Sequence, residues 1–376
     1  MFNPNLAARR DYRMKFSNLA FIVTDDCNFN CSYCLPKKEK KYMKRSTIEK
    51  AITFFYPFLQ EGAYIIFYGG EPLLAFDQIR YAVSLLQEKE KAREKKLKFS
   101  ITTNGSLVSD EILGFFNAHG FTLLLSFDGQ AQEIGREPGS RQFTQELIRR
   151  INRESYPGIE FSTNSVFTPD TVHYLSPSLR AIIEMGVTEV RLSLAEDQPW
   201  DEAGLMVLEN ELERLRDFLI SYYKERRIMP VIDFRPSERR TGEKKVFSCD
   251  GGRQRMAVGP GEELWGCLAF HGYLKDLQKN DDFDTYSFGK LDHFIENHET
   301  IYPQVLANYT MLRQDCFFTG KQFCFLCKEV EDCGICPVSA AHATSFIGKI
   351  PTWMCGLKQI LRKEKVKFLK EIDGIL

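Results

Sequence analysis

Short apolar runs and longer amphipathic stretches alternate along the first 226 residues of the chain. The apolar runs have the length of β-strands and lie at residues 18–24, 63–69, 97–103, 121–127, 159–167 and 188–194. Amphipathic stretches of helix length separate or follow these runs, at residues 46–60, 77–95, 109–119, 142–153, 170–185 and 202–225. Six strand and helix units in succession predict an α/β fold with a parallel sheet, which is either doubly wound or an open barrel.

The pattern changes after residue 226, where short hairpin-like pieces, loops and cysteines replace the long amphipathic stretches. The polar segment "PSERRTGEKK" at 236–245 has the composition expected of a domain boundary. We therefore expect an N-terminal extension at residues 1–16, a first domain at 17–235 and a cysteine-rich second domain at 236–376.

Composition narrows the class of protein. The chain has 376 residues, 43% of them hydrophobic, and a net charge of −1, so we expect a globular protein without the basic surface that nucleic-acid binding needs. No apolar run reaches the roughly 18 residues that a spanning helix requires, and the N-terminus lacks the apolar centre of a signal peptide. We expect a cytoplasmic protein that binds neither membrane nor nucleic acid, with eleven cysteines used for metal or redox chemistry rather than disulfides.

Three cysteines directly follow the first predicted strand. Cys27, Cys31 and Cys34 lie in "TDDCNFNCSYCLP", and the next cysteine in the chain is Cys249. Three thiolates on one short loop can bind three irons of a [4Fe-4S] cluster and leave the fourth iron open to a small molecule. The alternative is a structural zinc or cluster site that takes a fourth ligand from elsewhere, because zinc sites also use CxxC spacings. Parallel α/β folds place their chemistry at the carboxyl ends of the strands, so we expect a functional site here.

This loop resembles the CxxxCxxC motif of the radical S-adenosylmethionine (SAM) superfamily, with an aromatic residue before its last cysteine. The motifs "YGGEP" at 68–72, "TTNG" at 102–105 and "SFDG" at 126–129 are similar to strand-end motifs of that family. The resemblance implies a partial (β/α)6 TIM-like barrel in which the open iron chelates the amino and carboxylate groups of the SAM methionine. The residues that the resemblance assigns to cofactor binding are Tyr33, Gly69, Gly70, Glu71, Pro72, Asn104, Ser126, Asp128, Arg136 and Asn164.

Residue chemistry agrees with several of these assignments. Glycines let the backbone approach a ligand, Glu71 can accept a hydrogen bond from an ammonium group, and Ser126 can donate one to a carboxylate. By resemblance, Arg136 reaches the cofactor carboxylate and Asn164 contacts the ribose. Arg141 competes with Arg136 for the first role, and either arginine could instead lie on a surface loop.

Eight further cysteines occupy the second part of the chain, namely Cys249, Cys267, Cys316, Cys324, Cys327, Cys333, Cys336 and Cys355. The run "CFLCKEVEDCGIC" and the preceding hairpin "RMAVGPGEELWGC" resemble the SPASM domain, a small α+β extension of radical SAM enzymes that binds two auxiliary [4Fe-4S] clusters. The implied ligands are Cys324, Cys327, Cys333 and Cys355 for an outer cluster and Cys249, Cys267 and Cys336 for an inner one.

Two spacings depart from the SPASM pattern. Two residues rather than three separate Cys333 from Cys336, and five rather than four separate Gly261 from Cys267. Two zinc sites of four cysteines each also fit the cysteine count. Cys316 has no clear place in the pattern: it could complete the inner cluster, or act as a free catalytic thiol that donates hydrogen to a substrate radical. A further alternative leaves the inner cluster with an open iron that binds a substrate thiolate.

The resemblance implies an enzyme that reductively cleaves SAM to a 5′-deoxyadenosyl radical, with flavodoxin or ferredoxin as electron donor. Family members with both domains mostly modify peptides, and we expect a ribosomally made precursor peptide as substrate, with a thioether or other crosslink ahead of epimerisation. Only about seventeen residues precede the first predicted strand, so leader binding must come from the barrel, the bridge or another protein.

Two other functions stay open. Formylglycine formation on a sulfatase is disfavoured, because Leu268 follows Cys267 where sulfatase-maturing members usually carry an aspartate, and because the first cysteine loop continues as "CLP". An iron-sulfur electron carrier without catalysis is the alternative from another class. The intact "GGEP" motif argues against it, because an electron carrier does not need to hold a methionine group.

Overall fold

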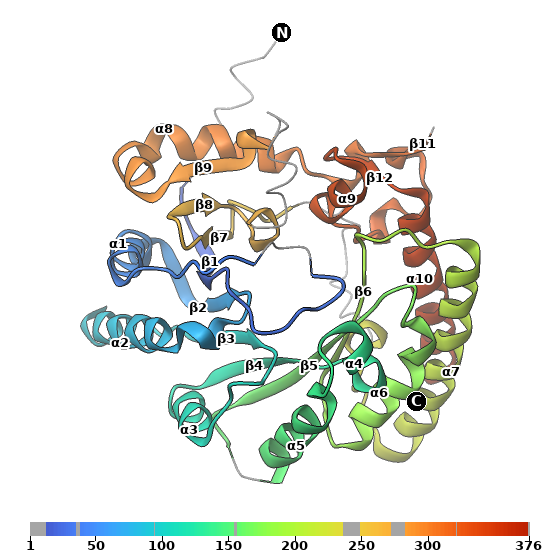
Figure 1. Cartoon of the computed structure of the whole chain (residues 1–376). Helices are drawn as coiled ribbons and strands as arrows, with labels where there is room; N and C mark the ends of the chain where they lie inside the picture. The colour runs from blue at the N-terminus through green and yellow to red at the C-terminus, as the bar shows by residue number, and fades with distance from the viewer. Residues whose placement is uncertain are drawn as a thin grey trace.

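A nine-stranded sheet organises the computed structural model, which describes residues 13–34, 38–93, 95–153, 156–235, 249–271, 283–320 and 322–374. Six strands come from the first part of the chain and pair in parallel (Figure 1). They are β1 (Phe16–Thr24), β2 (Leu59–Gly69), β3 (Lys98–Thr103), β4 (Phe121–Ser126), β5 (Glu160–Phe167) and β6 (Val190–Leu194). Their carboxyl ends therefore lie along one edge of the sheet.

The order of these strands distinguishes the two predicted architectures. From β6 to β1 the spatial order follows the sequence order without a reversal, so every helical connection leads to the neighbouring strand in the same direction. A doubly wound sheet would reverse its order at a switch point. The prediction of a partial barrel is therefore confirmed.

Helices cover the outside of these strands (Figure 1). They are α1 (Arg45–Phe55), α2 (Phe76–Arg93), α3 (Asp110–Ala118), α4 (Gln132–Gly135), α5 (Ser140–Arg153), α6 (Leu175–Glu184) and α7 (Glu202–Arg226). Along β4, Phe121, Leu123 and Leu125 are buried, while the residues between them are only half-buried. Because side chains alternate along a strand, Ser126 at the end of β4 lies on the half-buried face.

One predicted boundary is displaced. The expected helix at 46–60 ends at Phe55, and a short 3-10 turn over Tyr56–Phe58 leads directly into β2 at Leu59. Pro57 lies in this turn and has no backbone N–H to continue a helical ladder. The strand begins four residues before the predicted start at 63, because Leu59 pairs with Phe16 ahead of an irregularity in the register. The segment "LQEG" itself lacks the alternating apolar pattern of a strand.

The predicted hairpin forms, and it also joins the barrel sheet. Strands β7 (Arg255–Val258) and β8 (Glu263–Trp265) pair antiparallel, and β9 (Ser287–Lys290) pairs with β8. Strand β7 in turn pairs in parallel with β1, so the cysteine-rich part of the chain extends the sheet of the first part. The predicted boundary at 236–245 lies outside the described residues, and the division into domains stays a prediction.

The remaining elements are small strands and three helices. They are α8 (Leu291–Thr310), β10 (Phe318–Thr319), β11 (Gln322–Phe323), α9 (Pro337–Thr344), β12 (Lys349–Ile350) and α10 (Thr352–Asp373). The last helix packs along α7, which brings the end of the chain back against the barrel (Figure 1).

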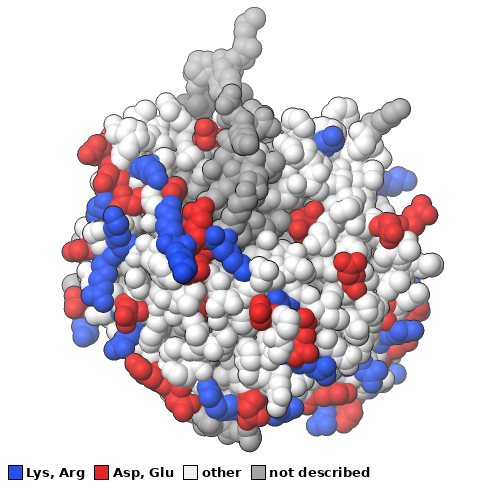
Figure 2. Space-filling view, viewed as in Figure 1, with Lys and Arg blue, Asp and Glu red and all other residues white. Residues whose placement is uncertain are grey.

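Charged side chains of both signs are mixed over the face of the molecule shown in Figure 2. Lys50 pairs with Asp292 at 2.7 Å and Arg80 with Glu111 at 3.1 Å, which agrees with the net charge of −1. Among the described residues, no helix is both long enough and apolar enough to cross a bilayer.

The contact between α7 and α10 depends on a buried ion pair. Arg216 binds Glu364, whose side chain is fully buried, and also lies 3.6 Å from the half-exposed Glu371. We expect Glu364→Ala to lower the free energy of unfolding by about 2 to 3 kcal/mol, because it leaves a buried guanidinium without its main partner. Glu371→Ala is the matched control and should change it by less than about 1 kcal/mol. Urea denaturation measures both, and equal effects would contradict the assignment.

Candidate functional site

The three cysteines of the first motif lie on a loop at the carboxyl end of β1, which we call the cysteine loop (residues 25–34). Burial raises the pKa of Cys27 to about 11, with smaller contributions from the charges of Glu71 and Cys31. Burial also raises the pKa of Cys34, and the charge of Cys31 is the next contributor. The three thiols are therefore close enough to interact electrostatically, as a shared ligand would require.

The "GGEP" turn after β2 packs directly on the cysteine loop. A Cβ atom at Gly69 would lie 2.2 Å from the carbonyl oxygen of Thr24, and one at Gly70 would lie 2.2 Å from that of Asp26. The backbone N–H of Gly70 donates to Thr24 at 3.0 Å, and that of Glu71 donates to Asp26 at 2.8 Å. We predicted glycines that approach a ligand, whereas here the close neighbour of both is the cysteine loop itself.

Glu71 is fully buried and its carboxylate is already occupied. It accepts hydrogen bonds from the backbone N–H of Leu73 at 3.0 Å, the hydroxyl of Thr103 at 2.7 Å and the backbone N–H of Asn104 at 2.8 Å. Burial raises the pKa of Glu71 from 4.5 to about 7, although these three donors oppose the shift. The carboxylate that we expected to accept from an ammonium group thus ties the end of β2 to the end of β3.

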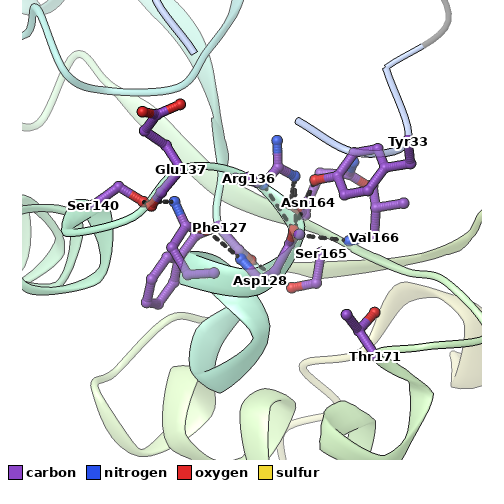
Figure 3. Close-up of polar contacts among 12 residues, drawn as sticks. Tyr33, Phe127, Asp128, Arg136, Glu137, Ser140, Asn164, Ser165, Val166 and Thr171 are labelled. Atoms are coloured by element: carbon purple, nitrogen blue, oxygen red, sulfur yellow. Dashed lines mark hydrogen bonds and ion pairs between the residues drawn. The ribbon is translucent and has the colours of Figure 1, made fainter. Parts of the chain in front are cut away.

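A second buried carboxylate organises the other side of the loop (Figure 3). Asp128 pairs with Arg136 at 2.9 Å and accepts from the hydroxyl of Tyr33 at 2.7 Å and from the backbone N–H of Val166 at 2.8 Å. The guanidinium of Arg136 also lies 5.4 Å from the centre of the Tyr33 ring. Burial raises the pKa of Tyr33 well above 10, so its hydroxyl remains a donor. This cluster fixes the end of the cysteine loop against β4 and β5.

The remaining predicted residues of the barrel differ in whether their side chains already have a hydrogen-bond partner in the protein. Asn104 donates to Asn28 of the cysteine loop at 3.0 Å, and Asn164 accepts from Ser193 at 3.0 Å, so both side chains already have protein partners. Ser126 pairs in register with Asn164, and among the described residues its hydroxyl has no hydrogen-bond partner. Its free hydroxyl makes Ser126 the predicted residue best placed to meet a ligand.

Pro72 begins a short 3-10 helix, and Arg141 is the second residue of the longer helix α5. Pro72 begins the 3-10 turn Pro72–Ala75 and is buried. Arg141 is half-buried in the first turn of α5, and it makes no contact with the Asp128 cluster among the described residues. Of the two competing arginines, the structure brings only Arg136 to this cluster.

The cysteines of the second part gather into two further thiol groups. Burial raises the pKa of Cys249 to about 12, with smaller contributions from the charges of Cys267 and Cys336. Burial raises the pKa of Cys324 to about 11, with further contributions from Cys355, Cys333 and Cys327. These inner and outer thiol groups contain the same residues as the two predicted ligand sets, and their metal ligation stays a prediction.

Cys316 lies apart from both groups. Its thiol is exposed, and the charges that act on its pKa are those of Asp315 and Arg313. Among the described residues, no group of three or more His, Cys, Asp or Glu side chains is placed to hold a single metal ion. The role of Cys316 as fourth ligand of the inner group therefore stays a prediction.

Two residues near the thiols were missed by the sequence analysis. Asp197 follows β6 at the carboxyl edge, burial raises its pKa, and its charge raises the pKa of Cys34. Tyr309 on α8 is fully buried beside the inner group, where its hydroxyl accepts from Gly266 at 2.9 Å and donates to Tyr286 at 2.7 Å. An acidic residue after a predicted strand could have revealed Asp197, whereas Tyr309 looks like any apolar position of a helix.

The structure is thus a partial parallel barrel that carries a three-cysteine loop at its carboxyl edge. The Radical SAM superfamily matches residues 21–182, which span β1 to most of α6. This part of the chain is a radical SAM domain.

Relatives in sequence match only part of the chain. An uncharacterized protein of Methanocaldococcus jannaschii is 26% identical over 208 residues, which cover 54% of this chain and 72% of the relative. The radical SAM cyclopropyl synthase TigE of Paramaledivibacter caminithermalis is 24% identical over 178 residues, and GTP 3′,8-cyclase of Aliarcobacter butzleri is 26% identical over 156. These matches cover 42% and 40% of this chain but only 37% and 47% of the two enzymes, less than half of their length.

Solved structures extend the likeness of fold to nearly the whole chain. The structure of anSMEcpe with bound AdoMet superposes with a TM-score of 0.70 at 16% identity and covers 96% of both chains. SuiB of Streptococcus suis bound to the precursor peptide SuiA superposes with a TM-score of 0.53 at 17% identity, covering 87% of this chain and 73% of SuiB. At these identities the likeness concerns the fold.

The tight turn at Gly70 gives a first prediction for the site. Gly70→Ala places a methyl group 2.2 Å from the Asp26 oxygen and 2.9 Å from the Cys27 Cβ atom, so we expect a loss of about 1 to 3 kcal/mol in stability and fewer irons bound at the cysteine loop. Gly114→Ala in α3 is the matched control, because nothing lies within 4 Å of its added Cβ atom. Denaturation and iron analysis test both, and a Gly70→Ala protein with normal stability and iron would show that the contact is unimportant.

The buried Glu71 gives a prediction for pH dependence. Its folded pKa of about 7 exceeds the ordinary 4.5, so its contribution to stability is present below pH 4.5 and is lost as the pH rises through 7. We expect the metal-free protein to lose up to about 3 kcal/mol more between pH 4.5 and 8 than its Glu71→Gln variant does. Glu111→Gln, at an exposed side chain, should leave the pH dependence unchanged. Parallel pH profiles for wild type and Glu71→Gln would contradict this assignment.

Proposed function

We propose that the chain is a radical SAM enzyme that holds a [4Fe-4S] cluster on Cys27, Cys31 and Cys34 and modifies a peptide. The radical SAM domain at residues 21–182, with three interacting thiols on one loop, is the observation that carries this proposal. When bound and reduced, such a cluster supplies the electron that cleaves the carbon–sulfur bond of SAM and yields a 5′-deoxyadenosyl radical.

The residues around the cysteine loop suit this pair of cofactors. Burial raises the pKa of Cys31, and the charges of Arg136 and Lys38 partly oppose this shift. The two cations therefore act in the direction of the thiolate that iron requires. Among the described residues the Ser126 hydroxyl has no hydrogen-bond partner, and it lies on the half-buried face at the carboxyl edge, where it can donate to a carboxylate. Glu71 and Asp128 act as positioning residues, because each uses its carboxylate to hold the loop from one side.

The two other thiol groups support a SPASM-type arrangement with two auxiliary [4Fe-4S] clusters. The outer group provides four thiols, as a fully ligated cluster needs, and the inner group provides three. A flavodoxin or ferredoxin would supply the electrons. The exposed position of Cys316 favours a free thiol that donates hydrogen to a substrate radical over a fourth ligand of the inner group.

A peptide substrate is favoured by the share of the chain whose fold matches structures with bound peptides. The radical SAM domain alone is similar to enzymes with unrelated substrates, as GTP 3′,8-cyclase illustrates. The fold over 96% or 87% of the chain is shared with anSMEcpe, which is also known with a bound Cp18Cys peptide, and with SuiB bound to its precursor peptide. We therefore propose a ribosomally made peptide as substrate, with a crosslink ahead of epimerisation.

Formylglycine formation is the alternative within the enzyme class. Leu268 occupies the position after Cys267 where a carboxylate base would be expected, and it lies in a tight turn, Leu268–Phe270. A leucine side chain cannot accept a proton, so this reaction would need a base from elsewhere.

Iron and deoxyadenosine measured on one sample test the proposal. Protein reconstituted without oxygen should contain about twelve irons and form 5′-deoxyadenosine with dithionite and SAM. Changing Cys27, Cys31 and Cys34 together to Ala should remove about four irons and abolish deoxyadenosine, because the auxiliary groups keep their own thiols.

Cys316→Ala is the matched control for the loss of a cysteine. It should leave the iron content unchanged, whereas a loss of iron would return Cys316 to the inner group. Deoxyadenosine formed by the triple variant would overturn the assignment of the cysteine loop. If the wild type contains iron but forms no deoxyadenosine, the electron-carrier function is favoured. If the eight cysteines of the second part bind zinc instead of iron, the auxiliary clusters are removed from the proposal.

A further inference from the structure

The cysteine loop and the loop that carries Cys267 are joined by one buried hydrogen bond. The Nε2 atom of His271 lies 2.9 Å from the Oδ1 atom of Asp25, and each residue is only 7% exposed. Asp25 stands two residues before Cys27, and His271 stands four residues after Cys267. The bond therefore connects two different thiol groups across 246 residues of sequence.

The path from Cys267 to His271 is short and rigid. A 3-10 turn over Leu268–Phe270 closes it, with the backbone N–H of Phe270 donating to Cys267 at 3.2 Å and that of His271 donating to Leu268 at 3.0 Å. On the other side, the backbone N–H of Asp25 donates to Lys41 at 3.0 Å. Movement at either thiol group is thus transmitted through few rotatable bonds.

The turn of the β7–β8 hairpin packs against the imidazole of His271. A Cβ atom at Gly259 would lie 2.8 Å from both the Cε1 and the Nδ1 atom of the ring, while Nε2 is bonded to Asp25. Each ring nitrogen therefore lies beside a group of the protein. The geometry is that of a residue that acts by holding other groups in place.

We infer that His271 is a positioning residue that couples the inner thiol group to the cysteine loop, so that a filled inner group strengthens the binding of SAM at the first site. This inference rests on the proposed function. The bond also orders the cysteine loop in the metal-free chain, because it is formed by residues of the protein alone.

The experiment combines SAM binding with a double-mutant cycle. We expect His271→Phe, which fills the space without the hydrogen bond, to weaken SAM binding to the reconstituted protein about tenfold with iron per chain unchanged. His271→Gln retains a donor and should recover part of the affinity. Cys267→Ala should weaken SAM binding by itself, and adding His271→Phe should then cost much less than tenfold, because the coupled partner is already lost.

A matched control separates this role from a general loss of stability. His119 also makes a side-chain hydrogen bond, at 2.9 Å to Gln87, but lies at the end of α3 away from the thiols. His119→Phe should leave SAM binding unchanged. Equal binding by wild type and His271→Phe, or full additivity with Cys267→Ala, would overturn the inference.

Hydrogen exchange on the metal-free protein keeps the inference testable if the proposed function fails. Loss of the bond should speed exchange of backbone amides in residues 26–34 and in 266–270 together, for His271→Phe and equally for Asp25→Ala. If the wild type binds no SAM but both variants show this paired change relative to the wild type, the proposed function fails and the structural coupling stands. Unchanged exchange in residues 26–34 would overturn the coupling whatever the SAM result.

Discussion

The close packing of the turn after β2 against the cysteine loop after β1 is the contact on which the rest of the site depends. Glycine is strongly favoured at position 70, because an added Cβ atom would lie only 2.2 Å from the carbonyl oxygen of Asp26. This approach requires neighbouring parallel strands that end at the same level, as the register from Leu19 with Ile65 to Thr24 with Gly69 provides. The cysteine loop thus takes its position from the sheet before any metal binds.

Packing the loops this closely removes water from polar groups, and the buried carboxylates compensate for that loss. Glu71 accepts three hydrogen bonds on one side of the loop, and Asp128 binds an arginine, a tyrosine and a backbone N–H on the other. Each network is costly if one partner is absent, because an unpaired charge would remain buried. The two networks therefore select one arrangement of the loop, and the His271 bond adds a third constraint from the second part of the chain.

Much of this architecture follows from local sequence patterns. The regular spacing of strand-length and helix-length stretches predicts a parallel α/β core, because period and length are local properties. The partial barrel and the two auxiliary ligand sets are expected from the family resemblance, and the strand order confirms the barrel. The assignment of the cysteines as metal ligands stays a prediction. The start of β2 at Leu59 escaped prediction, since "LQEG" has no alternating apolar pattern and Leu59 joins the sheet by pairing with Phe16 across an irregular register.

The sequence by itself determined the alternation of strands and helices that builds the parallel core, and the loop that carries three cysteines. Only the tertiary structure decided that β7 pairs with β1, that Glu71 faces protein donors, and that His271 meets Asp25. These contacts join residues far apart in the chain, and a side chain such as Glu71 or His271 can serve a ligand or the protein equally well on chemical grounds. Which of these it serves depends on the neighbours that folding brings within hydrogen-bond distance.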